Sequence, residues 1–143
     1  GAIRLDAGAK VVSGGGNIVL GGGTSPVTVA AAGSGADVDG VRLSGATLAS
    51  GGGHIRIMGA GAASGRGVLV QSSGVIDASA GRVEITGTGN GAAGVELASG
   101  TVGNASAASE VLLHAKGATG IALSGGVATT TGNVTLRAEV AGR

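Results

Sequence analysis

The sequence predicts an all-β protein, a parallel β-helix of about five three-stranded rungs with a period of roughly 27 residues. Three observations lead to this fold class. Val, Ile and Leu recur in pairs two positions apart, which places both side chains of a pair on one face of a strand. The strand patterns return at a nearly constant interval. Glycine, 33 of 143 residues, gathers between them, and the absence of aromatic residues requires a narrow core.

The first strand of each predicted rung begins with glycine and two apolar residues, in GVRL, GVLV, GVEL and GIAL. The leading apolar residues are separated by 27, 27 and 26 residues, and they are Val41, Val68, Val95 and Ile121. An earlier copy, AIRL, begins at Ala2. Stacking in register therefore places these residues above one another, with their second apolar partners forming a parallel column.

The second strand follows a corner rich in Ser and Gly. It contributes one apolar residue per rung: Val11, Leu48, Ile76, Val102 and Val127. The third strand carries NIVL, HIRI, RVEI, EVLL and NVTL, each with two inward apolar residues. Glycine runs at residues 14–16 and 51–53 suit the corners that lead into this strand, where positive φ angles exclude a Cβ. No segment shows the 3.6-residue periodicity of a crossover helix.

These patterns together define a predicted core stack. Its members are Val41, Leu43, Ile55, Ile57, Val68, Val70, Val83, Ile85, Val95, Leu97, Val111, Leu113, Ile121, Leu123, Val134 and Leu136. Outward positions alternate with them, and Arg56 is expected to lie beside Glu84 on adjacent rungs as a cross-strand ion pair. The outward residues Leu69 and Leu112 are candidate sites of lateral contact, because apolar side chains on a surface favour association.

One domain is expected over residues 1–143, with an excursion at residues 21–40. Ile3 and Val41 are 38 residues apart instead of about 27. The excursion holds the only proline, Pro26, and an alternating stretch, PVTVA, so it is either a long loop or an extra strand starting at an edge. Because insertions in a solenoid form loops on one face, it is the best candidate for a specialised surface.

The stretches GVRLSGATLASGGGHIRIMG and GNGAAGVELASGTVGNAS resemble the repeat region of filamentous-haemagglutinin-type exoproteins, the large adhesins of two-partner secretion. The resemblance covers nearly the whole chain apart from the excursion. It implies a right-handed coil, passage through an outer-membrane transporter during secretion from a Gram-negative cell, and a surface location. It also implies a stalk or adhesive fibre whose partner is a host-cell or matrix receptor.

Composition disfavours several other functions. A net charge of +1, with no Lys/Arg cluster, predicts no nucleic-acid binding. The string GNGAAG at residues 89–94 matches a dinucleotide motif, but a strand, GVEL, follows it where a helix would have to begin, so no cofactor is expected. The acidic residues are scattered over different strands, and His54 and His114 are expected at the surface, facing different directions. We therefore expect no enzyme and no metal site.

Asp37 and Asp39, in GADVDG, form the one candidate for calcium, since two carboxylates within one loop supply hard oxygen ligands. The alternative interpretation of this segment is a polar turn. Two triplets, at residues 104–106 and 133–135, match the glycosylation acceptor pattern, and such triplets arise readily in Ser/Thr-rich chains.

The expected function is that of a structural stalk or adhesive segment of a secreted bacterial surface protein. An alternative is a subunit that builds extracellular filaments by stacking its rungs end to end on other copies of itself. A polysaccharide-active β-helix enzyme is a third hypothesis, and it would need several carboxylates on one strand face.

Overall fold

The computed structural model describes residues 1–103 and 109–140 and folds them into three parallel sheets without a helix. The first sheet consists of β1 (Ile3–Leu5), β5 (Val41–Ser44), β8 (Val68–Gln71), β11 (Val95–Leu97) and β14 (Ile121–Leu123). The second consists of β2 (Lys10–Val12), β6 (Thr47–Ala49), β9 (Gly74–Asp77), β12 (Gly100–Val102) and β15 (Gly126–Val127). The third consists of β3 (Ile18–Leu20), β7 (Ile55–Ala60), β10 (Arg82–Thr88), β13 (Glu110–Gly117) and β16 (Asn133–Val140), with β4 (Ala31–Ala32) also pairing with β7.

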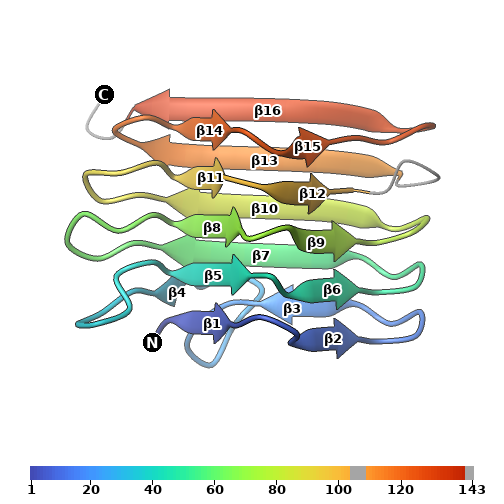
Figure 1. Ribbon diagram of the computed structural model, residues 1–143, viewed down its shortest axis with the longest axis horizontal. Coiled ribbons are helices and arrows are strands. Elements are labelled where there is room, and N and C mark those ends of the chain that lie inside the picture. The colour runs from blue at the N-terminus through green and yellow to red at the C-terminus, as the bar shows by residue number, and fades with distance from the viewer. Residues whose placement is uncertain (104–108, 141–143) are drawn as a thin grey trace.

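The strands form five rungs, each with one strand from every sheet, which confirms the predicted parallel β-helix. In Figure 1 the chain crosses the front from left to right through the first and second sheets, returns along the third, and rises by one rung. The coil is therefore right-handed, as parallel crossovers almost always are. The described ends of the chain lie at opposite ends of the stack. None of the described residues belongs to a helix that could span a lipid bilayer.

The register of the sheets confirms the predicted columns. Val68 pairs with Val41 on one side and Val95 on the other, and Val95 pairs in turn with Ile121. In the second sheet Leu48 and Ile76 pair directly. Twelve of the sixteen predicted core residues are at most 2% exposed: Val41, Leu43, Ile55, Ile57, Val68, Val70, Val83, Ile85, Val95, Leu97, Val111 and Leu113.

The fifth rung departs from the predicted core. Leu123, Val134 and Leu136 occupy their expected register positions but are 39%, 43% and 49% exposed, and Ile121 is only partly buried. The reason is geometric, because a residue in a stacked column is covered by the rungs on both sides. Above the fifth rung the described residues offer no further layer, so assigning Leu123, Val134 and Leu136 to the dry core was wrong, whereas Ile121 packs against the core.

Glycine occupies corners, as predicted, and also inward positions within the third sheet. At the corners, Gly14 and Gly51 both have positive φ and lie against each other in adjacent rungs. Inside β10, a Cβ on Gly87 would lie 2.0 Å from the carbonyl oxygen of Gly94. The backbone of the next turn packs directly on this strand, so the core tapers to backbone contact at this edge.

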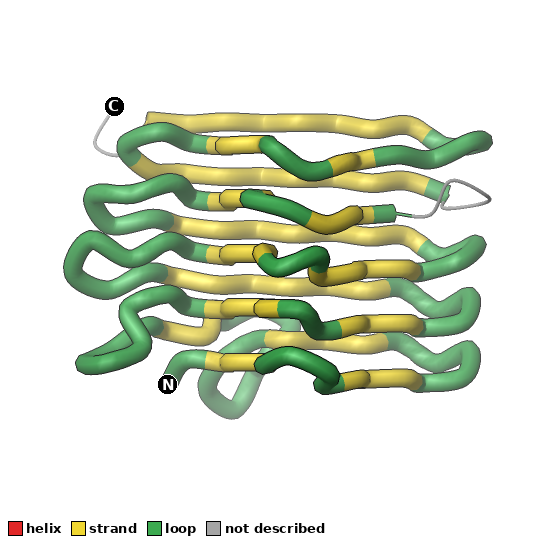
Figure 2. Tube along the Cα trace, in the orientation of Figure 1, coloured by secondary structure: helices red, strands yellow, loops and turns green. Residues whose placement is uncertain are grey.

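The excursion is a loop that interrupts one strand. Leu20 pairs with Ile57, and Ala31 pairs with Gly59 two positions later on the same strand. Residues 21–30 thus replace the single residue that would face Met58. In Figure 2 this segment extends beyond the first rung along the stack.

The structure decides between the two interpretations of the excursion and corrects its bounds. The stretch from Pro26 forms turns instead of an extra strand, with the amides of Thr28 and Val29 both donating to the carbonyl of Ser25. Residues 33–40 are not part of the insertion, because they form a corner that matches the corner of the next rung. There, Ser34 and Asp37 exchange two backbone hydrogen bonds.

Candidate functional site

The outward face of the third sheet carries a ladder of opposite charges. Arg56 and Glu84 are register partners, as predicted, and Arg56 Nη2 lies 3.9 Å from Glu84 Oε1. Arg82, at the start of β10, adds a second cation, with its Nη2 3.5 Å from Glu84 Oε2 and its Nε 3.3 Å from Glu110 Oε2. Glu84 therefore lies between two guanidinium groups that come from neighbouring rungs.

A side-chain ladder runs beside these charges at the corner before each strand. Asn17 Oδ1 accepts a hydrogen bond from the amide of His54 at 2.9 Å. His54 Nδ1 in turn accepts one from the amide of Arg82, also at 2.9 Å. The bonds continue the sheet beyond its strands and fix the imidazole. Since His54 Nδ1 is the acceptor, its Nε2 carries the proton of the neutral ring and is available as a donor at the exposed edge.

The insertion and this ladder enclose a groove of about 270 Å³. Val27, from the insertion, forms one wall, and the outward residues of the third sheet form the floor. The groove is lined by Asn17, Ile18, Val19, Val27, His54, Ile55, Arg56, Arg82 and Glu84. It brings together two cations, one anion, an amide and an imidazole beside aliphatic side chains. We call this the insertion groove.

The arginines of the insertion groove are incompletely paired. Their separations from Glu84, 3.5 and 3.9 Å, exceed the roughly 2.7–2.9 Å of a charge-assisted hydrogen bond. The Nε atoms of Arg56 and Arg82 are buried without a hydrogen-bond partner among the described residues. Both side chains are 40% exposed, so their remaining N–H groups reach the solvent. The groove therefore holds unused hydrogen-bond donors beside Glu84, and Arg82 is also paired by charge with Glu110, which lies outside the groove lining.

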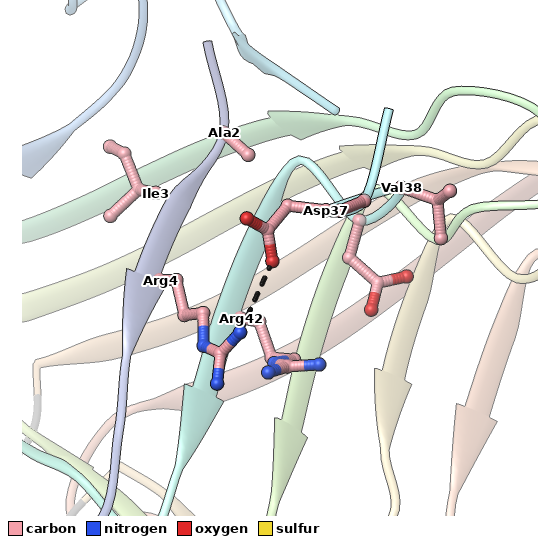
Figure 3. Close-up of a pocket in the computed structure, with 8 residues that line it drawn as sticks. Ala2, Ile3, Arg4, Asp37, Val38 and Arg42 are labelled. Carbon is pink, nitrogen blue, oxygen red and sulfur yellow. Dashed lines mark hydrogen bonds and ion pairs between the residues drawn. The ribbon is translucent and has the colours of Figure 1, made fainter. Parts of the chain in front are cut away.

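Asp37 and Asp39, the candidate calcium ligands, each face an arginine. Arg4 Nη1 lies 3.5 Å from Asp37 Oδ1, as Figure 3 shows, and Arg4 Nε bonds Asp6 at 2.8 Å. The cavity beside them measures about 40 Å³, close to the space of one water molecule. No group of three His, Cys, Asp or Glu side chains suited to a metal occurs within the described ranges. The paired backbone hydrogen bonds between Ser34 and Asp37 close a turn here, which supports the polar-turn interpretation of this segment.

Asp39 belongs to a second bridge, which spans three rungs. Its Oδ1 accepts a 2.8 Å hydrogen bond from the amide of Arg66 and lies 3.6 Å from Arg66 Nη1. The Nε of Arg66 bonds Glu96 on the next rung, and this hydrogen bond raises the pKa of the guanidinium, keeping it charged. Asp39 itself is only 7% exposed. The bridge thus ties the second, third and fourth rungs together along one corner.

The prediction that Leu69 offers a surface for lateral contact was wrong. Leu69 does not belong to the inward core cluster, and it lies between Arg42 and Glu96 in register, so it is on the outward side of the first sheet as expected. It is nevertheless only 3% exposed. Arg66 reaches across this side to bond Glu96, the register neighbour of Leu69. Leu112 remains half-buried on the third sheet and keeps some accessible apolar surface.

The remaining sequence candidates occupy ordinary structural positions. His54 is exposed, whereas His114 is half-buried and forms a 3.1 Å hydrogen bond with Glu139 on the next rung. Residues 89–94 form a turn that leads into β11, so no helix is present there to bind a pyrophosphate. Asn133 is the first residue of β16, and the triplet at residues 104–106 lies outside the described residues.

Sequence reasoning found the Arg56–Glu84 pair but missed the groove around it. Arg82 comes directly before Val83, the first apolar residue of its strand, and His54 comes directly before Ile55 in the same way. The contact between Arg82 and His54 could therefore have been predicted from the repeat. Val27 carried no such signal, since the fold of the insertion depends on turns that have no repeat elsewhere in the chain.

Comparisons of the chain with protein-family models, with curated proteins and with solved structures find no match.

Proposed function

We propose that this chain is a non-catalytic structural and adhesive segment of a secreted bacterial surface protein. The observation that carries the proposal is the combination of a regular five-rung stack with one insertion that leaves it. The stack supplies a stiff support through neighbour-to-neighbour pairing. The insertion presents Val27 and Val29, 48% and 45% exposed, at its surface. Adhesive proteins commonly place recognition on a loop carried by a rigid scaffold.

The resemblance to filamentous-haemagglutinin-type exoproteins supports the same function. Export through an outer-membrane transporter and a receptor on host cells or in the matrix belong to this proposal. The chemistry of the described surface is compatible with it, because the carboxylates that could support hydrolysis are engaged in ion pairs with arginines or histidine.

Attachment of coated beads tests the proposal. Beads carrying the chain are expected to bind cultured epithelial cells or matrix proteins above beads coated with albumin, and the soluble chain should compete. The matched control replaces residues 21–30 by one serine, which removes the insertion and keeps the rung register. If the two kinds of chain-coated beads bind no better than albumin-coated beads over a panel of cells and matrix proteins, the adhesive proposal is wrong.

A filament subunit is the second candidate, and the exposed apolar side chains of the fifth rung favour it. Leu123, Leu136 and Val140 are 39%, 49% and 52% exposed, and β16 pairs with a described strand along one edge alone. Such an edge can accept a strand of another copy. Sedimentation over a dilution series is expected to show mass increasing with concentration if filaments form. A constant monomer mass up to high concentration would exclude this candidate.

A further inference from the structure

We propose that the insertion groove binds the carboxylate of an acidic sugar, with the carboxylate received by Arg56 and Arg82. The inference rests on the proposed adhesive function and gives it a ligand class. It begins from the unused donors of the groove. Both guanidinium groups lie farther from Glu84 than a charge-assisted hydrogen bond, and Arg82 Nε lies 3.3 Å from Glu110 Oε2 without forming a hydrogen bond.

The charges around the groove favour a monoanion over a dianion. Arg56 and Arg82 contribute two positive charges, while Glu84 in the groove and Glu110, whose Oε2 lies 3.3 Å from Arg82 Nε, contribute two negative charges. A dianion such as a phosphate monoester would experience stronger repulsion from Glu84 than a monoanion. The planar fork of arginine matches the planar carboxylate in two parallel hydrogen bonds. Glu84 already shows that a carboxylate fits between these two side chains.

The other lining groups favour a sugar as the carrier of that carboxylate. Asn17 uses its oxygen for the amide of His54, which leaves its NH₂ group as a donor. The imidazole of His54 presents Nε2 in the same way. Hydroxyl groups of a sugar can accept both donors, while Val19 and Val27 provide aliphatic contact for a ring. At about 270 Å³ the groove has room for one such ring and lies near the lower end of ligand-site sizes.

The insertion completes the site. Val27 is the one lining residue that does not come from the regular rungs. Among the described residues, the equivalent outward positions on the later strands of the third sheet have no insertion beside them. The structure thus assigns a specific role to the break in the repeat, which is to turn an open charged face into a groove.

Titration of sodium glucuronate into the ¹⁵N-labelled full chain, followed by amide chemical shifts, tests the proposal. Saturable shifts are expected at Asn17, His54 and Arg56, with no comparable shifts for glucose. The double variant Arg56→Gln/Arg82→Gln should weaken binding by at least about tenfold, the effect of losing one charge-assisted hydrogen bond. Arg137→Gln is the matched control, because Arg137 is an exposed arginine of the same sheet outside the groove.

Further arms decide the ligand class. Arg56→Lys keeps the positive charge but loses the planar guanidinium, so it should also weaken binding. The circular dichroism spectrum of each variant verifies that the variant is folded. Equal affinity for acetate would overturn the role of the sugar. Tighter binding of glucose 6-sulfate, or of an acidic peptide, would overturn the assignment to a carboxylate sugar, as would glucuronate shifts that spare the groove.

Failure of this inference and failure of the adhesive function give different results. If bead attachment requires the insertion but is unchanged in the Arg56→Gln/Arg82→Gln variant, the adhesive function stands and the groove inference is wrong. If glucuronate binds in the groove while coated beads attach to nothing, the adhesive function is wrong and the groove inference stands on its own.

Discussion

Leu20 and Ala31 occupy consecutive inward positions of one strand line, although ten residues separate them in the chain. Leu20 faces Ile57 and Ala31 faces Gly59 on β7. The chain leaves the sheet after the first of these residues and returns in register at the second. The insertion is therefore an addition to a complete rung, and the stack neither bends nor slips to receive it.

Replacing residues 21–30 by one serine should leave the fold intact. Ile18 and Ile55 are 37 residues apart, whereas Ile55 and Val83 are 28 apart, so this change removes the nine extra residues. We expect an unchanged β-type circular dichroism spectrum and a free energy of unfolding within about 1 kcal/mol, since shortening a loop has a small entropic effect. As the contrasting variant, deletion of residues 72–80, which removes the whole of β9, should abolish the cooperative transition.

The loss of stability caused by placing aspartate in the inward column of the first sheet should depend on the rung. Leu97 is 1% exposed between Val70 and Leu123, so Leu97→Asp buries an unpaired charge and should cost more than about 4 kcal/mol, enough to unfold the chain. Leu123→Asp occupies the same column at 39% exposure and should cost about 1–2 kcal/mol. Denaturant unfolding of both variants measures the difference. Similar losses at the two positions would contradict burial by stacking.

Alanine at Gly87 should destabilise the third sheet. Its Cβ would lie 2.0 Å from the carbonyl oxygen of Gly94, and backbone cannot move aside as a side chain can. We expect a loss of about 1–3 kcal/mol or more, the range found for overpacked sites. Gly16→Ala is the control, because its nearest neighbours lie 3.8 Å away and its φ is not positive. Thermal unfolding should separate the two variants clearly, and equal melting temperatures would refute the close backbone contact.

Acid should remove the contribution of Glu139 to stability. The hydrogen bond from His114, followed by the charge of Arg137, lowers the pKa of Glu139 below its ordinary value. A carboxyl whose pKa is lower in the folded state stabilises the fold above its ordinary pKa, and this stability is lost as the pH falls through the folded pKa. Wild type should therefore melt higher than Glu139→Gln near neutral pH, and the difference should vanish in strong acid.

A double-mutant cycle tests the assigned cause of that pH dependence. In a His114→Ala background, the loss of stability caused by Glu139→Gln should shrink, because the principal hydrogen-bond partner is gone. High salt should reduce the same loss, since the pair is partly exposed. A loss that persists unchanged in the His114→Ala background would assign the effect to Arg137 instead.

The periodic part of the molecule was predictable because stacking imposes it on every rung. Val68 and Val95 share a column for the same reason that they share a place in the repeat. Burial at the fifth rung was not predictable from this pattern, since Leu136 has the alternation of Leu113 but no described layer above it. Leu69 was misjudged for a different reason. It lies between the long side chains of Arg42 and Glu96, and Glu96 is bonded by Arg66, which precedes the strand and lies outside the alternating positions.

The candidate site likewise combines residues of the repeat, which could be predicted, with a residue of the unique insertion, which could not. Arg56 and Glu84 belong to the repeat, so their pairing could be predicted from register. The wall of the groove depends on how Val27 is placed by turns within a unique segment, and one sequence contains no second copy from which to learn that geometry. The features most specific to this molecule thus arise where its repetition stops.

The opposite placement of the two described ends has a mechanical consequence. Hydrogen bonds between rungs run along the stack, so a force applied between the ends loads the ladders of one rung at a time. Each released rung would lengthen the chain by roughly 90 Å, given about 27 residues at up to ~3.5 Å each. The bridge from Asp39 through Arg66 to Glu96 crosses two of these seams, and peeling should pause there. Under tension this rod would behave as a stepwise extensible tether.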